Sequence, residues 1–185
     1  KIINCRVQQG DDLKSIIDNC IEDTNIEGII MLMGADRIPG QLIDHLGTLK
    51  IRIIMLDSNF DYPERRNNII QLMADTADGG RLCTEELYKA GHRKIAYIRN
   101  EPETNVTETR VDAMIKFCKE KSMELSAFTS SVRSWEDSME AACKVTLENM
   151  SAIKEKEISG IIYTSVNGAF ASIRPLRQAG FRIPE

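Results

Sequence analysis

The sequence predicts an α/β protein built on doubly wound, mainly parallel sheets. Short apolar runs alternate with amphipathic stretches along the chain, and the turns between them are short. The apolar runs are apolar throughout, which is typical of parallel strands buried on both faces. The order of strand, helix, strand, helix indicates the α/β class. In such sheets, ligands bind outside the carboxyl ends of the strands, where the winding direction switches.

The first part of the chain begins this alternation. A helix over residues 12–22 is indicated by Leu13, Ile17 and Ile21, which recur at helical spacing after two acidic residues. A helix over 39–49 has Pro39 at its start, where the missing N–H leaves no bond unmade. Apolar runs indicate strands at residues 1–7, 28–33, 51–56 and 69–73.

The second part continues the pattern. Strands are expected at residues 94–98, 128–132 and 159–163, and helices at 78–90, 107–121, 135–150 and 168–179. Gly91 and Gly180 follow two of these helices, as expected of residues that end a helix in the left-handed conformation. Ser134 is predicted to cap the helix over 135–150, with Asp137 completing a capping box.

Composition narrows the function classes. Lys and Arg total 24, Asp and Glu total 28, the formal net charge is −4, and 42% of the residues are hydrophobic. This balance excludes a disordered chain and disfavours a free-standing nucleic-acid binder, which usually carries a basic patch. No apolar run is long enough to span a membrane, and the first residues lack a signal-peptide pattern. Because both ends are abrupt, we expect the sequence to be a piece of a longer protein.

Signals for catalysis and metal binding are weak. The five cysteines are widely spaced and form no Cys-x-x-Cys motif, which favours free thiols in a reducing cytosol over a zinc site. No phosphate-binding glycine loop and no Gly-x-Ser-x-Gly motif is present. The two histidines do not pair with a visible nucleophile. We therefore expect neither an enzyme nor a bound metal or cofactor.

Residues 78–98, DGGRLCTEELYKAGHRKIAYI, form a more specific pattern. A helix begins at a glycine pair, stops at Gly91 and leads through His-Arg-Lys into a buried strand. This segment resembles the signature of the ligand-sensing domain of the lac repressor (LacI/GalR) family. Further segments are similar to that family in the same order, at residues 26–30, 51–57, 109–114, 158–164 and 174–185. The resemblance therefore covers nearly the whole chain.

The resemblance implies a two-lobed fold of the periplasmic-binding-protein-like type I. Residues 1–99 would form the N-terminal lobe and the crossover into the second lobe, and residues 100–185 would form the C-terminal lobe. Both lobes would be partial, without the family's first strand and helix and without its final strands. The implied protein is a cytoplasmic, non-enzymatic transcriptional regulator that binds a small sugar-like effector between its lobes and couples it to operator affinity. A homodimer is expected, with DNA bound only through a headpiece absent from this chain, and no membrane contact.

Two residues match the family's effector site directly. Asp57 ends its strand where the family has a carboxylate that accepts hydrogen bonds from sugar hydroxyls, and Arg110 matches the family's ligand-gripping arginine. The guanidinium of Arg110 is a fork of donors suited to diols or an anion. The alternative for each residue is a surface salt bridge.

Other positions depart from the family's pattern. Asp75 lies beside Ala74, which stands where the family has Asp, and Ser165 with Val166 stands where it has Asn-Asp. Arg133 stands where the family often has an aromatic residue that stacks on the sugar. Fewer carboxylates and one more arginine favour a sugar phosphate or sugar acid over a neutral sugar, provided that Arg133 points inward.

Three other functions are compatible with parts of the pattern. A solute-binding protein of a transporter shares the fold, although the unpaired cysteines and the Gly-His-Arg-Lys corner at residues 91–94 argue against it. A sensor module fused to a kinase or cyclase is the next alternative, and the flanking domains would identify it. A small-molecule enzyme ranks last, because no nucleophile and base are paired in the sequence.

Overall fold

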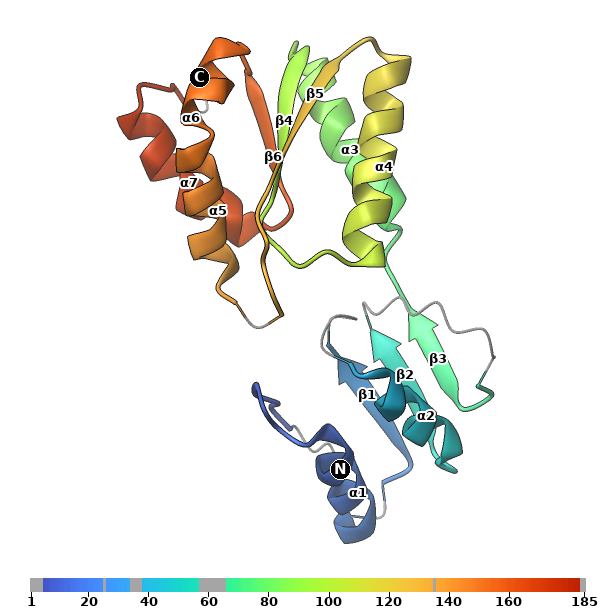
Figure 1. The fold of residues 1–185 in the computed structure, drawn as a ribbon. Coiled ribbons are helices and arrows are strands. Elements are labelled where there is room, and N and C mark those ends of the chain that lie inside the picture. The colour runs from blue at the N-terminus through green and yellow to red at the C-terminus, as the bar shows by residue number, and fades with distance from the viewer. Residues whose placement is uncertain (1–4, 25, 34–37, 57–65, 135, 184–185) are drawn as a thin grey trace. The chain divides into compact units, whose positions relative to one another are not determined.

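The computed structural model describes residues 5–24, 26–33, 38–56, 66–134 and 136–183 (Figure 1). The chain divides into two compact units, Lys1–Ala74 and Asp75–Glu185, each with its own sheet. Both sheets are three-stranded and parallel throughout. The predicted α/β class with parallel sheets is thereby confirmed.

The first unit is a parallel sheet with strand order β1-β2-β3 and two helices. Its elements are α1 (Leu13–Thr24), β1 (Gly28–Leu32), α2 (Gly40–Thr48), β2 (Arg52–Leu56) and β3 (Ile69–Leu72). The strand expected over residues 1–7 is wrong in its described part, because Cys5–Val7 have no regular secondary structure and no described strand pairs with them. Residues 1–4 lie outside the described part of the chain.

The core of the first unit lies on one face of its sheet. Ile17 of α1 and Leu46 of α2 pack in one buried cluster with Ile53 and Met55 of β2. On the opposite face, the side chains of Ile30 and Leu32 are 69% and 77% exposed. The expected burial of these strands on both faces is therefore not what the first unit shows, because α1 and α2 both pack on the same side.

The second unit has three layers, with helices on both faces of the sheet. Its elements are α3 (Thr76–Lys89), β4 (Lys94–Arg99), α4 (Asn105–Glu120), β5 (Glu124–Thr129), α5 (Ser138–Glu148), α6 (Met150–Glu155), β6 (Gly160–Tyr163) and α7 (Val166–Gln178). The strand order is β5-β4-β6. Helices α3 and α4 cover one face, and α5, α6 and α7 cover the other (Figure 1).

Strand β4 forms the centre of this unit. Ile95 and Tyr97 pack with Met114 of α4 on one face, and Ala96 packs with Ile153 of α6 on the other. All of these side chains are fully or almost fully buried. The strand is thus packed on both faces, as is typical of an apolar parallel strand. This packing also holds the polar residues at its carboxyl end in place.

Two elements differ from the sequence-based expectation. The helix expected over 135–150 begins at Ser138, because the carboxylate of Asp137 accepts from the backbone N–H of Met139 (2.8 Å) and of Glu140 (3.4 Å). The cap is therefore Asp137 and not Ser134, and a separate helix, α6, follows. Strand β5 covers 124–129 and not 128–132, since Glu124 to Thr129 pair in register with Lys94 to Arg99.

The boundary between the two compact units lies before α3, and the lobes expected from the sequence, residues 1–99 with the crossover and residues 100–185, stay a prediction. The boundary lies there because α3 makes a tight contact with α4. A Cβ atom added at Gly80 would overlap the backbone carbonyl of Arg110, so the two helices approach each other as closely as glycine allows. This contact holds α3 within the second unit.

Candidate functional site

The carboxyl ends of β4 and β6 form the switch point of the second unit. After β4 the chain crosses through α4 to β5 on one side, and after β5 it returns past β4 to β6 on the other. Adjacent parallel strands whose connections leave in opposite directions create a crevice at their carboxyl ends. Helices α4 and α7 both begin at this end of the sheet, because each follows one of these strands.

Asn100 occupies the centre of this end of the sheet and is fully buried. Its Nδ2 donates to the backbone carbonyl of Ser138 (3.0 Å) and to the Oγ of Ser165 (2.9 Å). One amide thereby connects the end of β4 with the starts of α5 and α7. Its Oδ1 is buried without a hydrogen-bond partner among the described residues.

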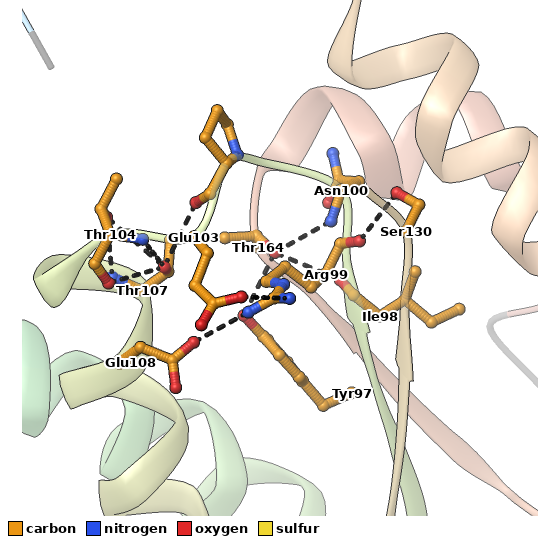
Figure 2. Close-up of polar contacts among 11 residues, drawn as sticks. Tyr97, Ile98, Arg99, Asn100, Glu103, Thr104, Thr107, Glu108, Ser130 and Thr164 are labelled. Carbon is orange, nitrogen blue, oxygen red and sulfur yellow. Dashed lines mark hydrogen bonds and ion pairs between the residues drawn. The ribbon is translucent and has the colours of Figure 1, made fainter. Parts of the chain in front are cut away.

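Thr164, at the end of β6, completes the connection between the two strands. Its Oγ1 donates to the carbonyl of Ile98 (3.2 Å) and accepts from the backbone N–H of Asn100 (3.2 Å), as Figure 2 shows. The hydroxyl of Tyr97 lies 3.3 Å from the same Oγ1. Burial raises the pKa of Tyr97, which keeps its phenol neutral over the ordinary pH range.

Arg110 reaches this end of the sheet from α4. Its Nη1 donates to the backbone carbonyl of Thr164 at 3.0 Å. The side chain is partly buried, and it makes no other hydrogen bond and no ion pair with the described residues. A guanidinium carries five donors, so most of those of Arg110 remain for a ligand with acceptor oxygens.

Arg99 is a second guanidinium here, but carboxylates of its own chain occupy it. Its Nη1 bonds to Glu108 at 2.8 Å and its Nη2 to Glu103 at 2.9 Å, as Figure 2 shows. The side chain of Arg99 is only 15% exposed. Beside these ion pairs, Thr104 and Thr107 form a reciprocal capping box at the start of α4. We interpret Arg99 as a structural residue that ties β4 to the first turns of α4.

Ser165 is the second predicted effector residue found at this end. Its Oγ caps α7 by accepting from the backbone N–H of Gly168 (3.2 Å), and it also accepts from Asn100. A hydroxyl that accepts twice still has its own proton to donate. Ser165 and Arg110 therefore both present donors at the switch point, held through Thr164 and Asn100.

The remaining predicted residues are held by local contacts or lie elsewhere. Asp75 caps α3, because its carboxylate accepts from the backbone N–H of Asp78 at 2.9 Å. Arg133 has a side chain that is 87% exposed, and its backbone N–H and guanidinium both bond to Glu136, which holds the pKa of that carboxyl below its usual range. The inward orientation on which the anionic preference depends is therefore not observed. Asp57 lies outside the described residues, and its role stays a prediction.

Sequence reasoning did not select Asn100, Thr164 and Tyr97 as site residues. Asn100 and Thr164 directly follow buried strands, so their position was the one available signal. Polar residues after strands are also common in solvated turns, so this position alone does not identify a site residue. The burial and hydrogen bonds of the Asn100 amide, which only the structure shows, make the distinction.

A hollow of about 300 Å³ lies at the opposite end of the sheet, beside the start of β6. Ile153, Ile158 and Phe181 line it together with Lys154 and Glu157. It lacks the convergent buried polar groups found at the switch point.

The described residues hold no cluster of ligating side chains that could bind a metal ion. Within the same residues, no helix has the length and apolarity to cross a bilayer.

The fold and the position of this polar cluster define a doubly wound α/β domain of the kind that binds ligands at its switch point. Residues 84–185 match the family model described as a periplasmic binding protein-like domain. Since this match spans more than half of the 185 residues, the chain belongs to that family. Among curated proteins, none matches the chain.

Solved structures with a similar fold include transcriptional regulators of the LacI family. A periplasmic binding protein/LacI transcriptional regulator from Alkaliphilus metalliredigens QYMF, complexed with D-xylulofuranose, is 22% identical, with a TM-score of 0.63 over 92% of this chain and 57% of that chain. A LacI-family regulatory protein from Chloroflexus aggregans is 19% identical (TM-score 0.72; 95% and 59%). A dimeric lac repressor is 17% identical (TM-score 0.68; 92% and 58%). The chain thus spans less than two thirds of these proteins and shares their fold.

Proposed function

We propose that this chain is the ligand-sensing domain of a cytoplasmic, non-enzymatic transcriptional regulator of the LacI type. It binds a small effector at the carboxyl ends of β4 and β6 and couples that binding to operator affinity through a DNA-binding headpiece elsewhere in the protein. The observation that carries the proposal is Arg110, whose partly buried guanidinium makes one hydrogen bond, to Thr164, beside the hydroxyl of Ser165. The similarity in fold to LacI-family regulators supports the regulatory role.

The donors at this end of the sheet favour an effector rich in acceptor oxygens. Arg110 and Ser165 suit the hydroxyls of a sugar, and the planar guanidinium also matches a phosphate or carboxylate. The effector class is therefore a sugar, a sugar phosphate or a sugar acid. The similar protein from Alkaliphilus metalliredigens holds a sugar, D-xylulofuranose, which is consistent with this class.

The coupling follows from linkage. An effector that binds one conformation of the regulator more tightly shifts the population towards it, and operator binding shifts effector affinity by the same factor. Such a coupling free energy is typically about 1–3 kcal/mol. No covalent step is required for such a coupling.

A thermal-shift panel tests the proposal. Neutral sugars, their phosphates and the matching sugar acids are each added to the wild-type chain, and at least one compound should raise the melting temperature. Arg110→Ala should lose this response, because removing a charged hydrogen bond to a buried ligand costs roughly 2–5 kcal/mol of binding free energy. Without ligand, the variant should melt near the wild type, since it loses one hydrogen bond worth about 1 kcal/mol.

Arg133→Ala serves as the matched control. It removes another arginine of the second unit, but one whose side chain is exposed and paired with Glu136. The response to the ligand should persist in this variant. A ligand response that survives in Arg110→Ala and disappears in Arg133→Ala would contradict the assignment of the site.

We also propose that the regulator is a homodimer that uses the outer surface of α5 and α7. Large apolar side chains are exposed on these neighbouring helices, among them Met139 and Leu147 of α5 and Val166 and Phe170 of α7. Exposed apolar side chains grouped on adjacent elements are typical of protein interfaces. The similar lac repressor structure is dimeric, which supports the proposal.

A further inference from the structure

Cys5 and Cys20 bring two thiols into contact in the first unit. Their Sγ atoms lie 3.5 Å apart, although 15 positions separate the residues in the sequence. Cys20 lies in the second half of α1, and Cys5 lies in the segment without regular secondary structure that precedes this helix. Cys5 is exposed and Cys20 is partly buried, so a dissolved oxidant can reach the pair from the side of Cys5.

A defined turn holds the two thiols together. The backbone N–H of Asp11 donates to the carbonyl of Gln8 (3.2 Å), and the carboxylate of Asp11 accepts from the N–H of Gln8 (2.6 Å). Gly10 adopts a φ of +91°, a conformation that side-chain-bearing residues rarely take. The turn reverses the chain, so that Cys5 lies beside α1 and next to Cys20.

The other cysteines have different surroundings. Cys83 is exposed on α3, and Cys118 is buried in the core of the second unit, where burial raises the pKa of its thiol. The thiol of Cys143 donates to the carbonyl of Ala171 at 3.1 Å. Within the described part of the chain, none of these three thiols contacts another thiol. The chain therefore offers one dithiol and one exposed single thiol for comparison.

We propose that Cys5 and Cys20 are a site of reversible oxidative modification by peroxides, and that they form a disulfide. The thiolate of Cys5 attacks one oxygen of hydrogen peroxide, the O–O bond breaks, a sulfenic acid forms, and the departing hydroxide takes up a proton from solvent to give water. The thiolate of Cys20 then attacks that sulfur and displaces hydroxide, which leaves as a second water after protonation. Both sulfurs are oxidised, and the peroxide takes up the two electrons.

The geometry requires only a small adjustment for this step. A disulfide joins sulfur atoms at about 2.05 Å, so the thiols must approach each other by roughly 1.5 Å from their separation of 3.5 Å. Cys5 lies in a segment outside the helices and strands, which can move by that amount without disturbing a ladder or a helix. The bond would tie this segment to α1 and close a short loop, which stabilises the folded unit. A reducing dithiol reverses the step by exchange.

Peptide mass spectrometry after treatment with hydrogen peroxide tests the proposal. The wild-type chain is oxidised, blocked with a thiol alkylator and digested without reductant. We expect a cross-linked peptide that joins Cys5 to Cys20, which disappears after dithiothreitol. The oxidised protein should also melt a few degrees higher than the reduced protein.

Three variants complete the test. Cys5→Ser and Cys20→Ser should each lose the cross-link and the rise in melting temperature, and the matched control Cys83→Ser should keep both. Conversion of Cys5 to sulfinic or sulfonic acid without any link to Cys20 would overturn the proposal, and so would linkage mainly between chains through Cys83. The outcome does not depend on the proposed effector site, since every step takes place in the first unit.

Discussion

Asn100 and Gly168 depend on each other at the end of the second unit's sheet. The amide of Asn100 bonds to Ser165, which caps α7, and Gly168 is the third residue of that helix. A Cβ atom at position 168 would overlap the Nδ2 of Asn100 and lie 2.7 Å from its Cγ. Because Asn100 is fully buried and bonded to two partners, it has little room to move away.

Gly168→Ala should therefore destabilise the protein, although alanine favours helix more than glycine does. We expect a loss of about 1–3 kcal/mol in the free energy of unfolding, the usual cost of overpacking. The matched control is Gly79→Ala in α3, where an added Cβ would have nothing within 4 Å. Gly79→Ala should be neutral or stabilising by up to about 1 kcal/mol. Urea denaturation measures the unfolding free energy of both variants. Equal changes in the two variants would contradict the prediction, because they would show that Asn100 moves aside to accommodate the added Cβ.

At the residue level, the sequence pointed to some positions of the candidate site and not to others. Arg110 and Ser165 were found through the family resemblance, and the structure brings both to the switch point. The placement of Arg133 assumed that a helix follows it directly, but α5 begins only at Ser138, and Arg133 pairs with Glu136. Asn100 was not selected, because burial of a polar side chain after a strand depends on helices that arrive much later in the chain.

Among the elements, β4 and β6 each contain a tyrosine whose ionisation is coupled to folding. Burial raises the pKa of both Tyr97 and Tyr163. A buried phenol that stays neutral binds its proton more tightly in the folded state than in the unfolded state. This contribution to stability is fully present below the unfolded pKa, about 10, and is lost as the pH rises from there through the higher folded pKa.

Stability should therefore decline as the pH rises above about 10, and the decline should be shallower in Tyr97→Phe and Tyr163→Phe. Phenylalanine keeps most of the packing and removes the ionisable group, although each variant loses a hydrogen bond, to Thr164 or to Thr146. The useful quantity is the slope of unfolding free energy against pH, measured by urea titrations from neutral to alkaline pH. Identical slopes in the wild type and both variants would contradict the coupling.

The elements themselves were predicted best where apolar runs are unbroken. Strands β1, β2, β4 and β6 were located to within two residues, because their interiors are apolar throughout. Strand β5 was placed too late, since Glu124, Ser126 and Thr129 make its pattern half polar at the edge of the sheet. The break between α5 and α6 at Asn149 was not predicted, because no proline or glycine marks it in the sequence.

For the whole molecule, the proposed homodimer gives a direct prediction. The side chain of Phe170 is 66% exposed on α7, next to the equally exposed Val166. Phe170→Glu would place a charge in the proposed interface, and the protein should become monomeric in sedimentation velocity at concentrations where the wild type is dimeric. Leu82→Glu on α3 is the control, an exposed apolar residue outside that surface. A wild-type chain that stays monomeric up to high concentration would contradict the proposal.

The division of the chain into its two compact units could not be predicted from the sequence. The family resemblance supplied the order of elements along the chain, whereas the assignment of α3 and β4 to the second unit follows from contacts far apart in sequence. The close approach of Gly80 to Arg110 is one such contact. The same contact positions Arg110 at the switch point, so it connects the architecture of the unit with the proposed effector site.

The central claim is that an effector binds at the carboxyl ends of β4 and β6, and backbone amide NMR tests it most directly. The isotope-labelled chain is titrated with the compound that gives the largest thermal shift. We predict the largest chemical-shift changes at Arg99, Asn100, Arg110, Thr164 and Ser165, and their loss in Arg110→Ala. Changes centred on Ile153, Ile158 and Phe181, around the hollow at the opposite end of the sheet, would contradict the claim.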